Sequence, residues 1–288
     1  MSINKIKERG MQAVFLVAAC VCILCVLLIC FFLFANGLPA IGEIGVFNFL
    51  LGTTWRPSND LYGIAPMILG SIYVTAGAIL IGVPIGLLTA VFMAKYCPKK
   101  LYKIVSPAVS LLAGIPSIIY GFFGLVVMVP LARELFGAFG CSGKSMLTAA
   151  VLLGMMILPT IITVSESAIR AVPESYYEGA LALGASHERA IFFTVLPAAK
   201  SGILAGVVLG IGRAIGETMA VIMIAGNQPV IPESIFLGVR TMTANIVLEM
   251  GYAADLHREA LIATAVVLFV FILLINFLFS LVKRRQNV

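Results

Sequence analysis

The sequence predicts an all-α integral membrane protein with six spanning helices, because its composition is strongly apolar and its apolar residues form long runs. The 288 residues are 61% hydrophobic and only 11% charged, and the mean hydropathy is +1.10. A soluble domain carries about 25% charged residues, so much of this surface is not expected to face water. Each run is long enough to cross a core about 30 Å thick as a helix that rises ~1.5 Å per residue. The six runs are Gln12–Phe34, Pro66–Ala94, Ile104–Leu131, Met146–Ser165, Ile203–Ala225 and Ala260–Val282.

The first run is interpreted as a retained helix and not as a secretory signal peptide. Cations precede it, as in a signal peptide, but it is well beyond the ~7–15 residues of a signal core, and no A-x-A cleavage pattern follows Phe34. We therefore expect residues 1–65 to form an N-terminal helix with an outer loop, and residues 66–288 to form a five-helix core. Four cysteines in this first helix are interpreted as small lipid-facing residues.

The distribution of cations predicts that both termini are cytoplasmic. Inner loops of membrane proteins carry the excess of Lys and Arg. With the N-terminus inside, five cations lie outside, Arg213 lies within the membrane, and the remaining ones lie on the inner face. Those are Lys5, Lys7, Arg9, Lys95, Lys99, Lys100, Lys103, Arg170, Arg189, Lys200, Lys283, Arg284 and Arg285. This topology accounts for the net charge of +6 without a nucleic-acid partner.

Three predicted outer loops and one long inner segment lie between the runs. The outer loops 36–65, 132–145 and 226–259 lack the length or pattern of a separate domain, and Trp55 and Tyr62 in the first of them suit the membrane interface. The inner segment 166–200 predicts two short helices along the inner face. Pro173 suits the first turn of one helix, Gly184 separates the two, and Pro197 is expected to end the second.

No catalytic, metal-binding or cofactor-binding site is expected. The sequence "GCSGKS" resembles the end of a phosphate-binding loop, but the required first glycine falls on Ala138. His187 and His257 are predicted to lie on opposite sides of the membrane, so they cannot share a metal ion. The chain is therefore expected not to be an enzyme.

The inner segment also carries a specific resemblance. Residues 178–197, "EGALALGASHERAIFFTVLP", resemble the EAA loop of permeases in bacterial ABC importers. Five residues fall in register, and two are replaced by small or β-branched ones: Glu178, Ala180, Gly184, Leu196 and Pro197 match, while Gly179 and Thr194 are the replacements. A short helix with small residues can enter a cleft of another protein, where Glu178 can pair with a cation. The alternative is an ordinary amphipathic surface helix between two spans.

A wider resemblance covers most of the chain from Trp55 to Asn227. The stretches "LLAGIPSIIYGFFG", "LPTIITVSESAIRAVPESYYEGALALGAS" and "LPAAKSGILAGVVLGIGRAIGETMAV" resemble the membrane subunits of Pst-type phosphate importers, and "GETMAV" resembles PstC more than PstA. The resemblance implies a MetI-like ABC importer permease core with an extra N-terminal helix, in the bacterial inner membrane. It also implies a PstA-like sister permease, a PstB-like ATPase dimer docked on Glu178, Gly179, Ala180 and Gly184, and a PstS-like periplasmic phosphate-binding protein.

Two charges in the fifth run are the main candidates for the substrate pathway. At 100° per residue, Gly202, Gly206, Gly210, Arg213, Glu217 and Ala220 share one stripe of a helix. Each intramembrane charge costs about 2.5–3.5 kcal/mol on insertion scales, so a functional role is the default interpretation. The guanidinium of Arg213 matches a tetrahedral oxyanion. Glu217, one turn on, could hold that guanidinium or accept a proton from phosphate, whereas a buried structural ion pair is the alternative.

The third run contains a second candidate wall of the pathway. In "GIPSIIYGFFG", Pro116 removes a backbone donor, and Ser117 and Tyr120 could offer hydroxyls to a substrate. A kinked and tightly packed helix is an equally acceptable interpretation. For the whole chain, alternatives to phosphate import are an ABC permease for sulfate or molybdate, a stand-alone ion-driven carrier or channel and, as a weaker candidate, an intramembrane hydrolase.

Overall fold

The computed structural model describes the backbone of residues 3–285 and the side chains of residues 10–281. Within that part of the chain, six helical segments are long and apolar enough to cross a membrane, which confirms the predicted number of spans. They are Gly10–Ile44, Ala65–Tyr96, Ser117–Phe139, Met146–Arg170, His187–Gly216 and Asp255–Leu281.

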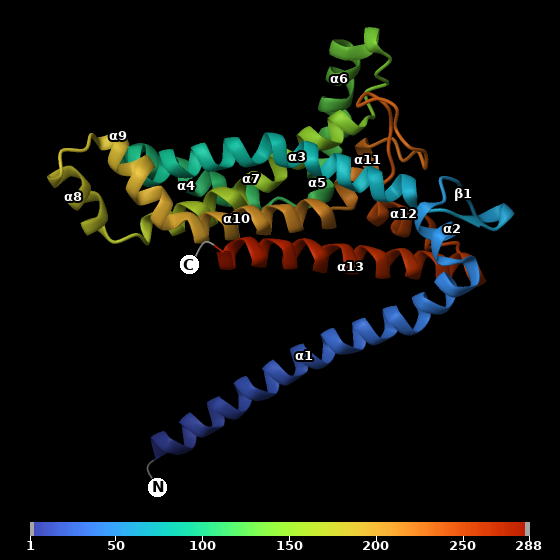
Figure 1. Cartoon of the computed structure of the whole chain (residues 1–288), viewed down its shortest axis with the longest axis horizontal. Coiled ribbons are helices and arrows are strands. Elements are labelled where there is room, and N and C mark those ends of the chain that lie inside the picture. Colours follow the sequence, from blue (N-terminus) through green and yellow to red (C-terminus); the bar gives the residue numbers. More distant parts are fainter. Residues whose placement is uncertain (1–2, 286–288) are drawn as a thin grey trace.

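Helices follow one another along almost the whole chain (Figure 1). The α-helices are α1 (Ile3–Ile44), α2 (Val46–Leu51), α3 (Ala65–Val91), α4 (Lys99–Gly114), α5 (Ser117–Phe123), α6 (Val129–Phe136), α7 (Met146–Arg170), α8 (Glu174–Ala182), α9 (His187–Ala190), α10 (Leu196–Gly216), α11 (Met219–Ile224), α12 (Met242–Glu249) and α13 (Asp255–Arg285). A small antiparallel hairpin of β1 (Trp55–Arg56) and β2 (Leu61–Tyr62) lies between α2 and α3.

Helix α7 is the central element of the bundle and packs against both α3 and α10 (Figure 1). Small residues permit this packing. A Cβ atom at Gly82 of α3 would lie 2.8 Å from the Gly154 carbonyl oxygen of α7, and one at Gly210 of α10 would lie 2.8 Å from Ile161 Cγ1. Both distances are too short for any larger side chain, so the three helices meet nearly backbone to backbone.

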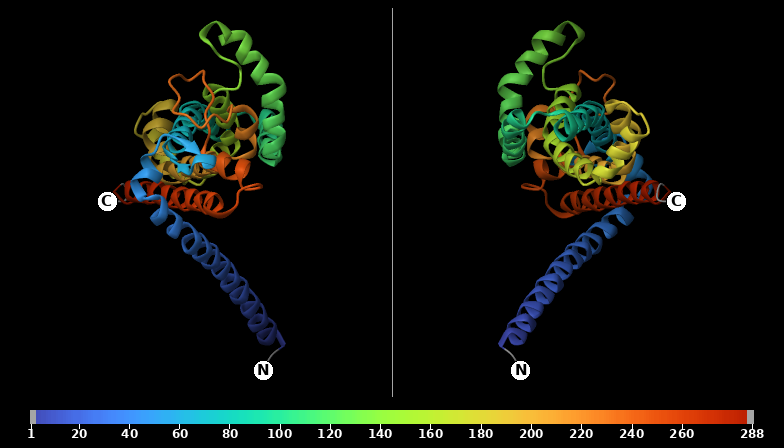
Figure 2. Two further views of the ribbon diagram at one scale, coloured as in Figure 1. Left: turned by 90° about the vertical axis from the view of Figure 1, so that its right-hand side faces the viewer. Right: turned by 90° about the vertical axis from the view of Figure 1, so that its left-hand side faces the viewer.

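Helix α1 diverges from the rest of the molecule (Figures 1 and 2). Its second half packs on α13, where a Cβ at Gly37 would lie 2.7 Å from Val266 Cγ2 and where Ala40 is fully buried. The large apolar side chains from Val14 to Phe32 are more than half exposed. Most of α1 therefore presents an apolar surface outside the bundle, as expected for a separate N-terminal helix.

Prolines coincide with three wide turns in these helices. A proline lacks an amide hydrogen and clashes with the carbonyl four residues earlier, and a π-helical turn displaces that carbonyl. Each π-turn here ends two residues before a proline: η2 (Phe92–Tyr96) precedes Pro98, η3 (Gly124–Met128) precedes Pro130, and η5 (Ile191–Val195) precedes Pro197. In η5 the Leu196 amide donates to the Ile191 carbonyl, and the helix continues through Pro197. The prediction that Pro197 ends a helix was wrong.

The third predicted run is interrupted inside the bundle. Helix α4 ends at Gly114, Ile115 and Pro116 are extended, and α5 begins at Ser117. The Leu112 carbonyl would normally accept from the amide of residue 116, which proline lacks, and it accepts a hydrogen bond from Tyr120 Oη at 2.9 Å instead. The expectation of one continuous helix over Ile104–Leu131 was therefore wrong, and Tyr120 compensates for the break.

Candidate functional site

The glycine stripe of α10 forms the contact with α7, as its spacing predicted. A Cβ at Gly202 would lie 2.4 Å from Ala168 Cβ, and one at Gly206 would lie 3.0 Å from Ser165 Oγ. Arg213 continues the stripe toward the end of the helix. It is half-buried, and its Nη1 donates to Thr160 Oγ1 of α7 at 3.4 Å.

Glu217 does not pair with Arg213, and this part of the prediction was wrong. Helix α10 ends at Gly216, and Glu217 is extended, with φ −69° and ψ 130°. Its Oε1 accepts hydrogen bonds from the amides of Thr218, at 3.1 Å, and Ala220, at 3.2 Å. The first amides of a helix have no partners within that helix, so the carboxylate caps α11. Among the ion pairs of the described residues, none joins Arg213 to Glu217.

The Arg213 guanidinium therefore keeps most of its hydrogen-bonding capacity. It has five N–H donors, and within the described part of the chain its one hydrogen-bond partner is Thr160. The neighbouring Gly212 and Gly216 are exposed, and a Cβ on either would meet nothing within 4 Å. A half-buried cation thus lies beside an open face, next to a break in the helix.

The second candidate segment packs against the same break. Tyr120 is 9% exposed and shares an apolar cluster with Ala214 and Ala220. A Cβ at Gly121 would lie 2.9 Å from the Ala220 Cα atom, so α5 and α11 touch. Ser117 is half-buried at the start of α5. The two interrupted helices, α4–α5 and α10–α11, are therefore brought together by α5 and α11.

The inner loop contains the first of the two predicted short helices, α8, which ends just before Gly184. The second, α9, is the beginning of the long helical segment His187–Gly216, so the prediction of a second short helix along the inner face was wrong. The φ of Gly184 is +85°, a left-handed conformation that ends α8 and that favours glycine. Ser186 Oγ caps α9 by accepting the Arg189 amide at 3.3 Å. Glu178 and Gly179 are exposed, Ala180 is half-buried, and a Cβ at Gly179 would meet nothing within 4 Å. The residues predicted to dock a partner are therefore accessible on α8.

Comparison with known proteins gives the family. The model of the family described as binding-protein-dependent transport system inner membrane components matches residues 82–288. This chain is a member of that permease family. The phosphate transport system permease protein PstC of Mesorhizobium japonicum is 37% identical over 84% of the chain and 80% of its own length. The probable ABC transporter permease protein YqgH of Bacillus subtilis is 39% identical over 86% of the chain and 83% of its own length.

The solved structures confirm the fold. A chain of the methionine ABC transporter MetNI, in an inward-facing conformation, matches with a TM-score of 0.64 and 22% identity, covering 81% of this permease and 99% of that chain. The permease is thus a multi-pass inner membrane protein with a MetI-like core. Its relatives are transport components of ABC transporters and not enzymes.

A network on the loop side of the permease fastens α8 to the bundle. Lys95 of η2 lies 3.8 Å from the Glu174 carboxylate and 5.6 Å from the centre of the Tyr177 ring. Tyr177 Oη lies 2.6 Å from His187 Nδ1, and the His187 ring packs edge-on against Tyr96 of η2. These contacts join α8 to η2, the turn that connects α3 to α4.

Arg170 of α7 also contacts η2. Its Nε lies 2.7 Å from Glu166 Oε1, and its Nη2 donates to the Met93 carbonyl at 2.8 Å. The guanidinium also lies 4.6 Å from the centre of the Tyr102 ring of α4. Glu166 and Arg170 have the i, i+4 spacing of a helical ion pair, and this spacing is the signal that could have indicated the pair.

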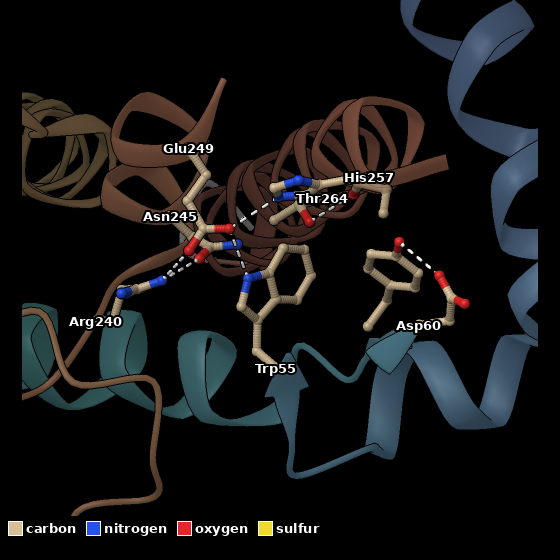
Figure 3. Close-up of polar contacts among 9 residues, drawn as sticks. Trp55, Asp60, Arg240, Asn245, Glu249, His257 and Thr264 are labelled. Atoms are coloured by element: carbon tan, nitrogen blue, oxygen red, sulfur yellow. Dashed lines mark hydrogen bonds and ion pairs between the residues drawn. The ribbon is translucent and has the colours of Figure 1, made fainter. Parts of the chain in front are cut away.

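The opposite end of the permease carries a buried polar cluster that the sequence did not indicate (Figure 3). We call Trp55, Arg240, Glu249 and His257 the outer network, after the predicted outer loops that contain them. Glu249, the last residue of α12, accepts from Trp55 Nε1 at 2.9 Å, pairs with Arg240 and lies 2.9 Å from His257 Nε2. Trp55 and Tyr62 are each only 4% exposed. They therefore form part of a buried cluster, and their expected position at the lipid interface was wrong.

Proposed function

We propose that this permease is the membrane-spanning subunit of an ATP-driven importer that carries inorganic phosphate inward. The observation that carries the proposal is the half-buried guanidinium of Arg213 beside the break between α10 and α11, where the described residues supply no carboxylate partner. Similarity to PstC permeases, which are named for phosphate transport, supports the identity of the cargo.

Arg213 is suited to a tetrahedral oxyanion that passes the break. Its planar set of donors can form two parallel hydrogen bonds with two phosphate oxygens. Non-helical backbone at membrane depth is tolerated where it is buried in protein or lines a water-filled cavity, and both interrupted helices fit the wall of a pathway. Ser117 and Tyr120 contribute to this wall. The second carboxylate oxygen of Glu217 can accept a hydrogen bond from the hydroxyl of hydrogen phosphate, a donor that sulfate lacks.

The exposed face of α8 is the docking surface for a PstB-like ATPase dimer, which supplies the hydrolysis of ATP. Glu178 is exposed on α8, and elsewhere on the same segment Tyr176 is 51% and Leu183 is 92% exposed; exposed apolar groups of this kind typically mark an interaction surface. A PstA-like sister permease and a PstS-like periplasmic binding protein complete the complex. In this arrangement residues 1–65 form one N-terminal unit and residues 66–288 form the five-helix core. Both termini and α8 lie in the cytoplasm.

Reversing the charge of Glu178 is expected to uncouple ATP hydrolysis from uptake. The Glu178→Lys variant would repel the cation that Glu178 contacts on the ATPase, so phosphate uptake by the reconstituted complex should fall at least about tenfold. ATP hydrolysis and phosphate uptake are measured on the same proteoliposomes. Glu188→Lys, an equal charge reversal at an exposed position of the same loop, is the control. Equal behaviour of the two variants would contradict docking at Glu178.

Competition between anions tests the cargo. Uptake of labelled phosphate into proteoliposomes that contain the complete complex should require ATP and should be unaffected by a large excess of sulfate or molybdate. Inhibition by either anion to the level produced by unlabelled phosphate would favour the alternative oxyanion. Uptake by the permease alone, without ATP or partner chains, would favour an ion-driven carrier.

A further inference from the structure

Helix α12 connects the outer network to the helix break beside Arg213. Its last residue, Glu249, lies in the outer network. At its first turn, Thr243 Oγ1 donates to the Glu217 carbonyl at 3.1 Å. Thr243 and Glu249 are each 7% exposed. A single short helix therefore joins two sites that are far apart in the sequence.

The first turn of α12 is held firmly in place. The Met242 amide donates to Ser71 Oγ of α3 at 2.9 Å. Thr241 Oγ1 caps the helix by accepting the Ala244 amide at 3.2 Å. The chain before α12 also lies directly on α3, because a Cβ at Gly70 would be 2.5 Å from the Arg240 carbonyl oxygen. Thr243 thus approaches Glu217 from a rigid support.

The far end of α12 is equally well anchored. Besides its ion pair with Glu249, Arg240 donates through Nε to the Asn227 carbonyl at 2.9 Å and through Nη1 to Asn245 Oδ1 at 3.0 Å. Asn227 follows α11 by three residues, so the same arginine joins the end of α11 to α12. Both ends of α11 are consequently tied to α12, through Thr243 at one end and Arg240 at the other.

The contact at Glu217 falls where the direction of the chain changes. Glu217 and Thr218 lie between α10 and α11, and carbonyls at the end of a helix lack partners within it. The hydrogen bond from Thr243 satisfies one of them and fixes how α11 leaves α10. Arg213 lies one turn earlier on α10 and has one weak hydrogen bond of its own, to Thr160. The position of Arg213 relative to the break therefore depends on the contacts that fix the angle between α10 and α11.

We propose that α12 is a strut that sets the geometry of the α10–α11 break, and that Thr243 is a positioning residue for Arg213. The proposal rests on the proposed function, because it assumes that phosphate passes Arg213. The strut holds the break at the angle at which the guanidinium meets the anion. Changes in the outer network reach the pathway through this helix.

Removal of the Thr243 hydroxyl tests the strut in the complete complex with ATPase, sister permease and phosphate-binding protein. Thr243→Val keeps the shape of the side chain but removes both hydrogen bonds of the hydroxyl, the one to the Glu217 carbonyl and the one with Thr241 Oγ1. It should lower the phosphate carried per ATP hydrolysed about fivefold, within the range expected for one or two hydrogen bonds. The rate of ATP hydrolysis should change less than about twofold, because the inner loop is intact. Thr243→Ser restores the hydroxyl and should restore the ratio. Thr264→Val is the matched control, because Thr264 is also buried and its hydroxyl, among the described residues, bonds to the Ala260 carbonyl of its own helix and to no other helix.

The results for the three variants show whether Thr243 acts as a positioning residue or serves packing alone. A ratio of phosphate to ATP in Thr243→Val equal to that of Thr264→Val would overturn the strut. So would a low ratio that Thr243→Ser does not restore, or a Thr243→Val complex that fails to assemble, since Thr243 would then serve packing or folding alone. Failure of the proposed function is recognised separately, because in that case the unmodified complex would not carry phosphate.

Discussion

Replacement of Arg213 by glutamine is expected to abolish phosphate uptake, lowering it at least about 100-fold in a complex that still assembles. Hydrogen bonds from a charged donor contribute about 1.5–3 kcal/mol each, and the loss of two of them accounts for this factor. The hydrogen bond that this change removes within the described structure is the long one of 3.4 Å to Thr160, so the complex should still assemble. Uptake of labelled phosphate into proteoliposomes and the amount of assembled complex provide the measurement.

The expectation that the Arg213→Gln complex still assembles depends on the absence of an Arg213–Glu217 ion pair. Removing one partner of a buried pair leaves an uncompensated charge and destabilises the fold. Here Glu217 satisfies its Oε1 at the cap of α11, so the change at Arg213 leaves that interaction intact. Arg213→Lys keeps the charge without the planar donors and should retain part of the uptake. Normal uptake by Arg213→Gln would mean that the anion does not meet this residue.

Replacement of Glu249 by alanine is expected to destabilise the permease by about 3 kcal/mol, within the range found when a buried ion pair loses one partner. The side chains of Glu249 and Arg240 are only 9% and 15% exposed. Truncation leaves the Arg240 charge without its carboxylate and removes the acceptor of Trp55 Nε1. Trp55 is the only tryptophan of the chain, so the fluorescence of the purified permease reports directly on the outer network during unfolding.

Glu233→Ala provides the comparison for this prediction. Glu233 is an exposed carboxylate on the same outer segment, and exposed substitutions usually change stability by less than about 0.5 kcal/mol. Glu249→Gln keeps an acceptor for Trp55 but loses the charge, so its stability should fall between the other two. If Glu249→Ala and Glu233→Ala unfold at the same denaturant concentration, the outer network does not stabilise the permease.

Features that depend on neighbouring residues were predictable from the sequence. The number of spans follows from apolar length, and the contact of α10 with α7 follows from glycines at a spacing of four. The joint at Gly184 follows from the need for a left-handed conformation at the end of a helix. Each of these depends on a repeat or a backbone preference within a few residues, which a single sequence displays.

Features that depend on competing partners were not predictable. An arginine and a carboxylate four residues later form the usual helical ion pair only if the helix continues between them. Helix α10 ends at Gly216, so Glu217 instead accepts hydrogen bonds from the first amides of α11. Pro197 was expected to end a helix, but the π-turn before it removed the clash. The outer network joins Trp55 to residues near position 250, and no periodic pattern indicates such contacts. The apolar pattern therefore determined which segments are helical and membrane-spanning. Only the tertiary structure decided which polar atoms meet, because that depends on where each helix stops and on what lies beside its end.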